Sequence, residues 1–150
     1  MNSTSNASVR YLMSCALLAL VYYVAAQLGL ALAFEQVNTS PVWPPTGIAM
    51  AAVIYFGLRI WPGILLGAFL INLSIGTPLI AAFTIGIGNT LEAVVAGFLI
   101  LRYGDRYPFS HIPGTALFVV VAFFATMISA TIGVSTLLLH GIIDSNIYGL

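Results

Sequence analysis

The chain has 150 residues, of which 61% are hydrophobic and 5% are charged. A soluble domain needs about 25% charged residues to cover its surface, so this composition excludes a water-soluble globular protein and predicts a membrane protein. Lysine is absent and four arginines balance four acidic residues, which leaves no basic patch for nucleic acid. The single cysteine, Cys15, excludes a disulfide framework within one chain.

Three apolar segments are long enough to cross a bilayer, which requires roughly 20 residues. They are Tyr11–Phe34, Leu79–Leu101 and Thr115–Leu139. Arg59 divides the intervening region into two shorter apolar pieces, Val42–Leu58 and Ile60–Ile75, which suit a thin membrane. We therefore expect an all-α, multi-pass transmembrane helical bundle of about five spans, preceded by a cytoplasmic tail at residues 1–10.

Two other interpretations of these segments fit less well. Ala31-Leu32-Ala33 resembles a signal-peptide cleavage site, but the apolar run before it is longer than the roughly 7–15 residues typical of a removable segment. A re-entrant loop between residues 41 and 76 would place Arg59 near the bilayer centre, at a cost of at least ~2.5 kcal/mol.

The arginines predict the orientation, because cytoplasmic loops carry the excess of positive charge. With the N-terminus inside, the five-span model places every arginine on the cytoplasmic side: Arg10, Arg59, Arg102 and Arg106. The odd number of spans then places Leu150 outside.

The segment 41–47, PVWPPTG, contains three prolines and a tryptophan suited to the membrane interface. Proline is favoured in the first helical turn, so the simplest interpretation is a helix start. Irregular backbone at membrane depth is tolerated mainly where it lines a cavity, so the same segment also predicts the floor of an outward-facing pocket. The two interpretations are compatible.

Glu92 lies about ten residues before Arg102, or roughly 15 Å from the predicted end of its helix, near the bilayer midplane. It shares a helix face with small and polar residues that we expect to pack inward: Ala82, Gly86, Asn89, Ala93 and Ala96. A carboxyl group there should be protonated and hydrogen-bonded, or paired with a donor such as Asn72 on the preceding helix. Glu92 therefore either forms a structural hydrogen bond between helices or belongs to a site that responds to a ligand or a proton.

Small-residue patterns predict tight helix association. Gly63 and Gly67 form a G-x-x-x-G pair that would serve packing within one chain or in a homodimer. A second stripe runs along the last helix: Thr126, Ser129, Gly133, Thr136 and His140.

No catalytic constellation is evident. His111 and His140 are predicted to lie outside the bilayer, so no intramembrane serine–histidine pair can form. His140 and Asp144 alone would be an incomplete metal site. We predict no enzymatic activity, no metal and no cofactor.

Three motifs in order resemble the bacterial membrane-associated sensor domain of the MASE type. They are PVWPPTGIA at 41–49, RIWPG at 59–63 with GAFLINL at 67–73, and GIGNTLEAVVAG at 86–97. The resemblance implies a multi-pass input module of the bacterial inner membrane, usually joined to cytoplasmic histidine kinase, PAS or diguanylate cyclase domains. The family's domain continues through further helices, so we expect the membrane domain at 11–150 to be incomplete at its C-terminus.

The resemblance and the residue patterns together predict a sensory input module whose stimulus is a small molecule or the membrane itself. An output domain in the same protein would act through two-component or cyclic di-GMP signalling. The candidate ligand-binding or switch residues are Trp43, Pro44, Pro45, Thr46, Asn72, Asn89, Thr90 and Glu92. The alternative is a small-solute transporter or a transporter's membrane subunit, because a buried carboxylate beside a proline-broken helix also suits a carrier.

Overall fold

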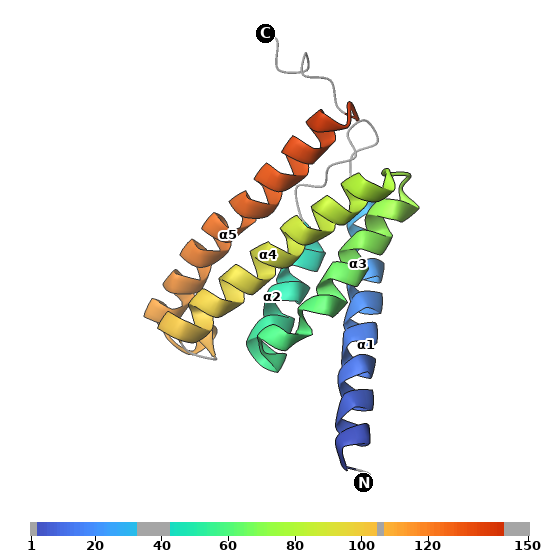
Figure 1. Cartoon of the computed structure of the whole chain (residues 1–150). Helices are drawn as coiled ribbons and strands as arrows, with labels where there is room; N and C mark the ends of the chain where they lie inside the picture. Colours follow the sequence, from blue (N-terminus) through green and yellow to red (C-terminus); the bar gives the residue numbers. More distant parts are fainter. Residues whose placement is uncertain (1–2, 33–42, 105–106, 143–150) are drawn as a thin grey trace.

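The computed structural model (Figure 1) describes residues 3–32, 43–104 and 107–142, and these ranges form helices and no strand. The predicted all-α fold is confirmed. The α-helices are α1 (Ser3–Ala31), α2 (Pro44–Phe56), α3 (Trp61–Ser74), α4 (Leu79–Tyr103) and α5 (Ile112–Leu139), with short 3-10 helices η1 (Leu58–Ile60) and η2 (Pro108–Ser110). Each α-helix matches a predicted segment within a few residues, except that α1 begins inside the predicted tail. Phe34 and Val42, two predicted segment ends, lie outside the described residues.

Three helices are long and apolar enough to cross a membrane: Asn6–Ala31 within α1, Leu79–Tyr103 and Ile112–Leu139. The helices α2 and α3 have 13 and 14 residues, which at 1.5 Å per residue gives each a length of about 20 Å. Both are shorter than the hydrocarbon core of a typical bilayer, about 30 Å thick.

Prolines begin the two short helices and glycines end or connect them. Pro44 and Pro45 stand in the first turn of α2, and Pro62 stands in that of α3, where a missing N–H removes no helical hydrogen bond. Gly57 after α2 and Gly76 between α3 and α4 both have φ of 85°, a conformation that glycine adopts without steric cost. The interpretation of segment 41–47 as a helix start is confirmed for its described part.

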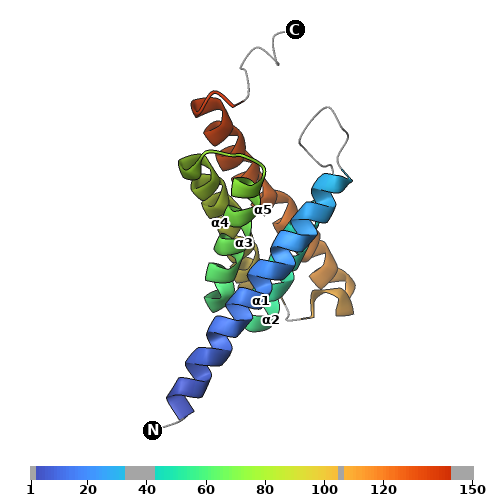
Figure 2. The ribbon, with the colours of Figure 1, turned by 90° about the vertical axis from the view of Figure 1, so that its right-hand side faces the viewer.

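The helix α4 is central, since it packs against α2, α3 and α5, while α1 packs against α2 and α3. Figures 1 and 2 show α1 and α5 on opposite sides of the bundle. Half of the α4 span is buried, whereas only 11% of the α5 span is buried. Most of α5 therefore faces outward. The predicted inward face of α4 is confirmed, because Ala82, Gly86, Glu92, Ala93 and Ala96 are all buried.

The G-x-x-x-G pair is used within the chain. A Cβ atom built on Gly63 would lie 2.6 Å from the carbonyl oxygen of Cys15, and one built on Gly67 would lie 2.8 Å from Cβ of Tyr22. Both glycines therefore bring α3 into backbone contact with α1, as small residues do between membrane helices. This packing face is already occupied and is not free for a second copy of the chain.

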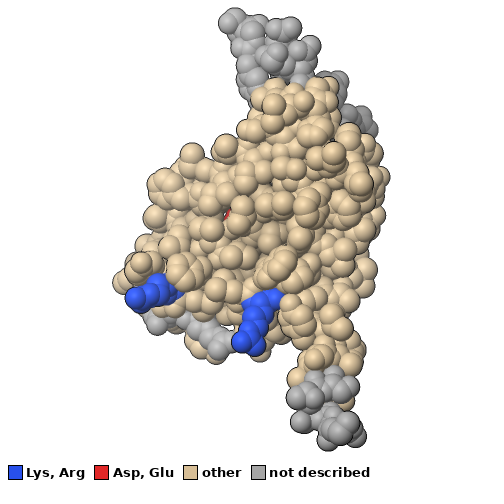
Figure 3. Space-filling view, in the orientation of Figure 1, with Lys and Arg blue, Asp and Glu red and all other residues tan. Residues whose placement is uncertain are grey.

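The described arginines lie at one end of the bundle. The start of α1, η1 and the end of α4 are all at the lower end in Figure 1, and the hydroxyl of Tyr11 donates a 3.0 Å hydrogen bond to the carbonyl oxygen of Arg59. Figure 3 shows basic side chains at this edge and an otherwise almost uncharged face. The grouping of Arg10, Arg59 and Arg102 agrees with the predicted topology, and its assignment to the cytoplasmic side stays a prediction; Arg106 lies outside the described residues.

Candidate functional site

Glu92 is the only acidic residue among the residues that the structure describes, and its side chain is 3% exposed. Its Oε1 atom is buried without a hydrogen-bond partner among the described residues. Buried polar atoms are nearly always hydrogen-bonded, and an ionised carboxylate without partners in an apolar interior costs several kcal/mol. Glu92 therefore marks a position where a proton or an added hydrogen-bond donor has a large effect.

Two hydroxyl groups from other helices interact with the Glu92 carboxyl group. Thr46 reaches it from the first turn of α2, and Ser129 reaches it from the middle of α5. The hydroxyl of Ser129 also donates a 2.6 Å hydrogen bond to Oδ1 of Asn89, one turn before Glu92 on α4. Polar groups of α2, α4 and α5 thus meet inside an otherwise apolar bundle.

The Ser129 hydroxyl lies between two polar side chains. A serine hydroxyl carries one hydrogen, and in this structure it donates to Oδ1 of Asn89, while Ser129 also interacts with the Glu92 carboxyl group. Asn89 and Glu92 therefore compete for the same hydroxyl group.

Helix α1 contributes Tyr22 to the same region. Tyr22 is 1% exposed, its hydroxyl interacts with the indole of Trp43, and it lies within electrostatic range of Glu92. Gly67 makes room for this side chain, because any Cβ there would press on Tyr22. We call the group contributed by these four helices the polar junction: Tyr22, Trp43, Thr46, Asn89, Glu92 and Ser129.

The structure brings together four of the predicted site residues, namely Trp43, Thr46, Asn89 and Glu92. Pro44 and Pro45 are packing residues at the start of α2: Pro45 is buried, and the Cδ atom of Pro44 lies 3.1 Å from the position of a Cβ on Gly29. The predicted pocket over Trp43–Thr46 stays a prediction, because these four residues do not line the cavity described next. A cavity of about 830 Å³ includes Gly47 of that segment but extends along α2 toward Phe56.

Asn72, considered above as one possible donor to Glu92, is not its partner in the structure. The amide of Asn72 donates a 2.8 Å hydrogen bond to the carbonyl oxygen of Ala68 in its own helix. The rings of Phe69 and Phe83 are in contact, with centroids 6.0 Å apart, so Asn72, one turn nearer the hairpin, lies opposite the start of α4. Glu92 is roughly 15 Å further along α4, beyond the reach of an asparagine side chain.

Thr90 is buried but lies apart from the polar junction. Residues two positions apart on a helix point about 200° apart, and Thr90 faces α3. It lines a cavity of about 320 Å³ with Trp61 and Leu65, and its hydroxyl donates a 2.7 Å hydrogen bond to the carbonyl oxygen of Gly86.

Sequence reasoning did not identify Tyr22 and Ser129 as site residues. Ser129 does belong to the predicted stripe on α5, although the face of α5 that packs on α4 includes Val121, Ala125 and Ile132 and leaves Thr126 exposed. The sequence indicates Tyr22 less clearly. It is the polar member of a buried stripe on α1 that also contains Ala19 and Ala26. Which helix that stripe contacts is not encoded in its spacing.

Comparison with known proteins identifies one family. The MASE1 family model matches residues 15–149, a range that contains the whole polar junction. No curated protein and no solved structure matches the chain.

Proposed function

Since the chain belongs to the MASE1 family of membrane-associated sensor domains, we propose that it is the sensory input module of a bacterial inner-membrane signalling protein. We further propose that the polar junction is its switch. The observation that supports this role is the unpartnered, buried Oε1 of Glu92 at a point where four helices meet. The module needs no chemistry of its own.

The switch acts through hydrogen-bond exchange. A donor that reaches Oε1, or a change in the protonation of the carboxyl group, changes how strongly Glu92 competes for the Ser129 hydroxyl and so alters its bond to Asn89. Because packed helices are bistable rather than continuously deformable, such an exchange moves α2 and α5 relative to α4. A stimulus shifts the equilibrium between the two helix arrangements only if it interacts more strongly with one of them than with the other.

The output of this module is proposed to be a cytoplasmic histidine kinase or diguanylate cyclase domain in the same protein. Sequencing the gene beyond the Leu150 codon tests this. A reading frame that continues into such a domain supports the proposal, and an immediate stop codon contradicts it for this chain.

The switch is tested with Glu92→Gln in the full-length protein. Glutamine keeps the shape of the neutral acid but cannot lose its hydrogens to become an anion. We expect the cellular output, measured as regulator phosphorylation or cyclic di-GMP, to change about fivefold or more, which is the range of typical allosteric coupling.

Asn72→Ala is the matched control, because it removes a polar side chain bonded only to its own helix in the described structure. Its output should equal that of the wild type. If Glu92→Gln lowers thermal stability while output is unchanged, the polar junction is a structural bond and the switch proposal fails.

A carrier is the competing function, since the same buried carboxyl group suits proton-coupled transport. Purified protein in liposomes loaded with a pH-sensitive dye separates the two. A sensor gives no proton flux above that of empty liposomes under a potassium diffusion potential. Flux that Glu92→Gln abolishes would instead establish transport.

A further inference from the structure

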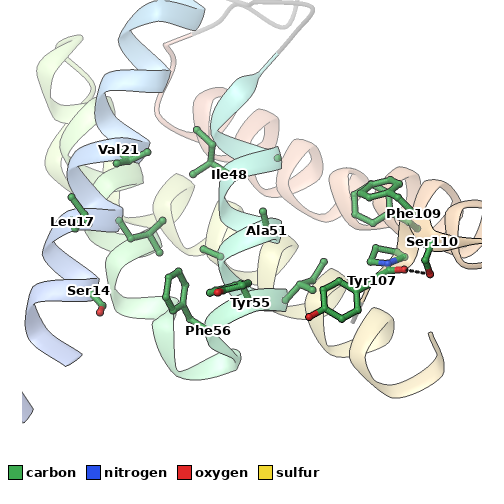
Figure 4. Close-up of a pocket in the computed structure, with 16 residues that line it drawn as sticks. Ser14, Leu17, Val21, Ile48, Ala51, Tyr55, Phe56, Tyr107, Phe109 and Ser110 are labelled. Atoms are coloured by element: carbon green, nitrogen blue, oxygen red, sulfur yellow. Dashed lines mark hydrogen bonds between the residues drawn. The ribbon is translucent and has the colours of Figure 1, made fainter. Parts of the chain in front are cut away.

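A groove of about 830 Å³ runs between α1, α2 and the connection that contains η2 (Figure 4). The geometry points to a binding site for one anionic membrane lipid, whose acyl chain occupies the groove and whose headgroup lies at the end of the bundle that carries the arginines. This inference rests on the membrane location of the family. It does not depend on the switch role of Glu92, so either proposal can fail without the other.

The body of the groove matches a hydrocarbon chain. Its volume is within the range of about 300–1,000 Å³ typical of ligand pockets, and its walls are almost entirely apolar. They include Leu17 and Val21 of α1, Ile48 and Ala51 of α2, Phe109 of η2 and Phe118 of α5. The groove lies between two apolar helices, so in a membrane acyl chains are the available apolar partners.

Polar side chains gather toward one end of the groove. Figure 4 shows Ser14, Tyr55 and Tyr107 at the end opposite Val21 and Ile48, and the hydroxyl of Ser110 is directed to the carbonyl oxygen of Tyr107. Hydroxyl groups at one end of an apolar groove suit an amphiphile, whose head is polar and whose tail is not.

The arginines at this end of the bundle favour an anionic head. The hydroxyl of Ser14 donates a 3.0 Å hydrogen bond to the carbonyl oxygen of Arg10, which places Arg10 one turn from the groove. The hydrogen bond from Tyr11 holds Arg59 against the same turn of α1. Arginines near a membrane surface attract anionic lipid headgroups.

Helix α2 is shared by the groove and the polar junction. Gly47 lines the groove and the adjacent Thr46 reaches Glu92, while on α1 Val21 lines the groove beside Tyr22. A bound acyl chain therefore touches both helices directly next to the residues that surround Glu92. The lipid composition of one leaflet would therefore affect the switch through these contacts with α1 and α2.

Native mass spectrometry of the full chain in detergent tests the site, with phosphatidylglycerol and phosphatidylcholine added in equal amounts. The wild type should retain one phosphatidylglycerol, preferred at least about tenfold. Ala51→Trp fills the groove and should lower retention about tenfold. Ala130→Trp, on the exposed face of α5, is the matched control and should retain lipid like the wild type; equal retention by both variants overturns the site.

Two further measurements keep the test independent of the folding of Ala51→Trp. Replacing Arg10 and Arg59 by Gln should remove the preference for phosphatidylglycerol but keep an acyl chain bound, and an unchanged preference refutes the anionic head. A phosphatidylglycerol probe with a photoreactive acyl chain should label Ile48 and Ala51 of the wild-type protein in nanodiscs. Equal labelling of Phe123 and Phe124 on exposed α5 would show ordinary contact with bulk lipid and overturn the proposal.

Discussion

The hydroxyl of Ser129 donates a 2.6 Å hydrogen bond to Oδ1 of Asn89 and so joins the middle of α5 to the middle of α4. The bond spans two helices whose contact is otherwise formed by apolar and small residues, such as Ile132 against Gly88. It fixes the register of α5 at the level of Glu92. In the proposed switch, a change at Glu92 would reach α5 through this pair of atoms.

Removal of the Ser129 hydroxyl should destabilise the bundle modestly. Hydrogen bonds between membrane helices contribute about 0.6 kcal/mol on average and up to about 1.7 kcal/mol. We expect Ser129→Ala to lower the free energy of unfolding by that amount, measured by SDS-induced unfolding followed by circular dichroism. Ser135→Ala, exposed on the same helix, should have no measurable effect. Equal losses in the two variants would mean that the Ser129 bond contributes nothing specific.

Gly67 should not tolerate alanine. The added Cβ would lie 2.8 Å from Cβ of Tyr22 and 2.9 Å from the carbonyl oxygen of Ala19, so α1 and α3 must separate. Overpacking of this kind costs typically about 1–3 kcal/mol, measurable as a lower melting temperature in detergent. Gly133→Ala is the control, because nothing lies within 4 Å of its Cβ position. If both variants melt alike, α1 and α3 are not packed as described.

Gly97 and Val53 should show energetic coupling. A Cβ on Gly97 would overlap Cγ1 of Val53, which is fully buried in α2. Gly97→Ala and Val53→Ala should each destabilise the protein, but the double variant should be more stable than their sum by about 0.5–3 kcal/mol, as contacting residues show. Strict additivity in a double-mutant cycle would contradict the packing of α2 on α4.

The topology can be tested by cysteine labelling in a Cys15→Ala background. Ser110, in η2, lies at the end of the bundle with the arginines, and Thr77 lies in the hairpin at the opposite end. With a cytoplasmic N-terminus, Thr77→Cys should react with a membrane-impermeant maleimide in spheroplasts, whereas Ser110→Cys should react only after lysis. The reverse pattern would invert the predicted orientation.

The helices were predictable because apolar length and proline position encode them locally. The inward face of α4 was predictable for the same reason, since Asn89, Glu92 and Ala93 share a side at helical spacing. Contacts between helices were harder to predict from the sequence. The pairing of Asn72 with Glu92 failed because the hairpin register places them far apart along α4, and the role of Tyr22 depends on how α1 crosses α3. The groove could not be anticipated, because its walls come from three segments with no common motif.

Thr90 and Glu92 lie on opposite sides of α4, one facing the cavity beside Trp61 and the other facing the polar junction. An axial rotation of this helix would move the two side chains in opposite directions with respect to their neighbours. The cavity beside Trp61 and the polar junction therefore could not rearrange independently if α4 turned, because one rigid helix carries a wall of each.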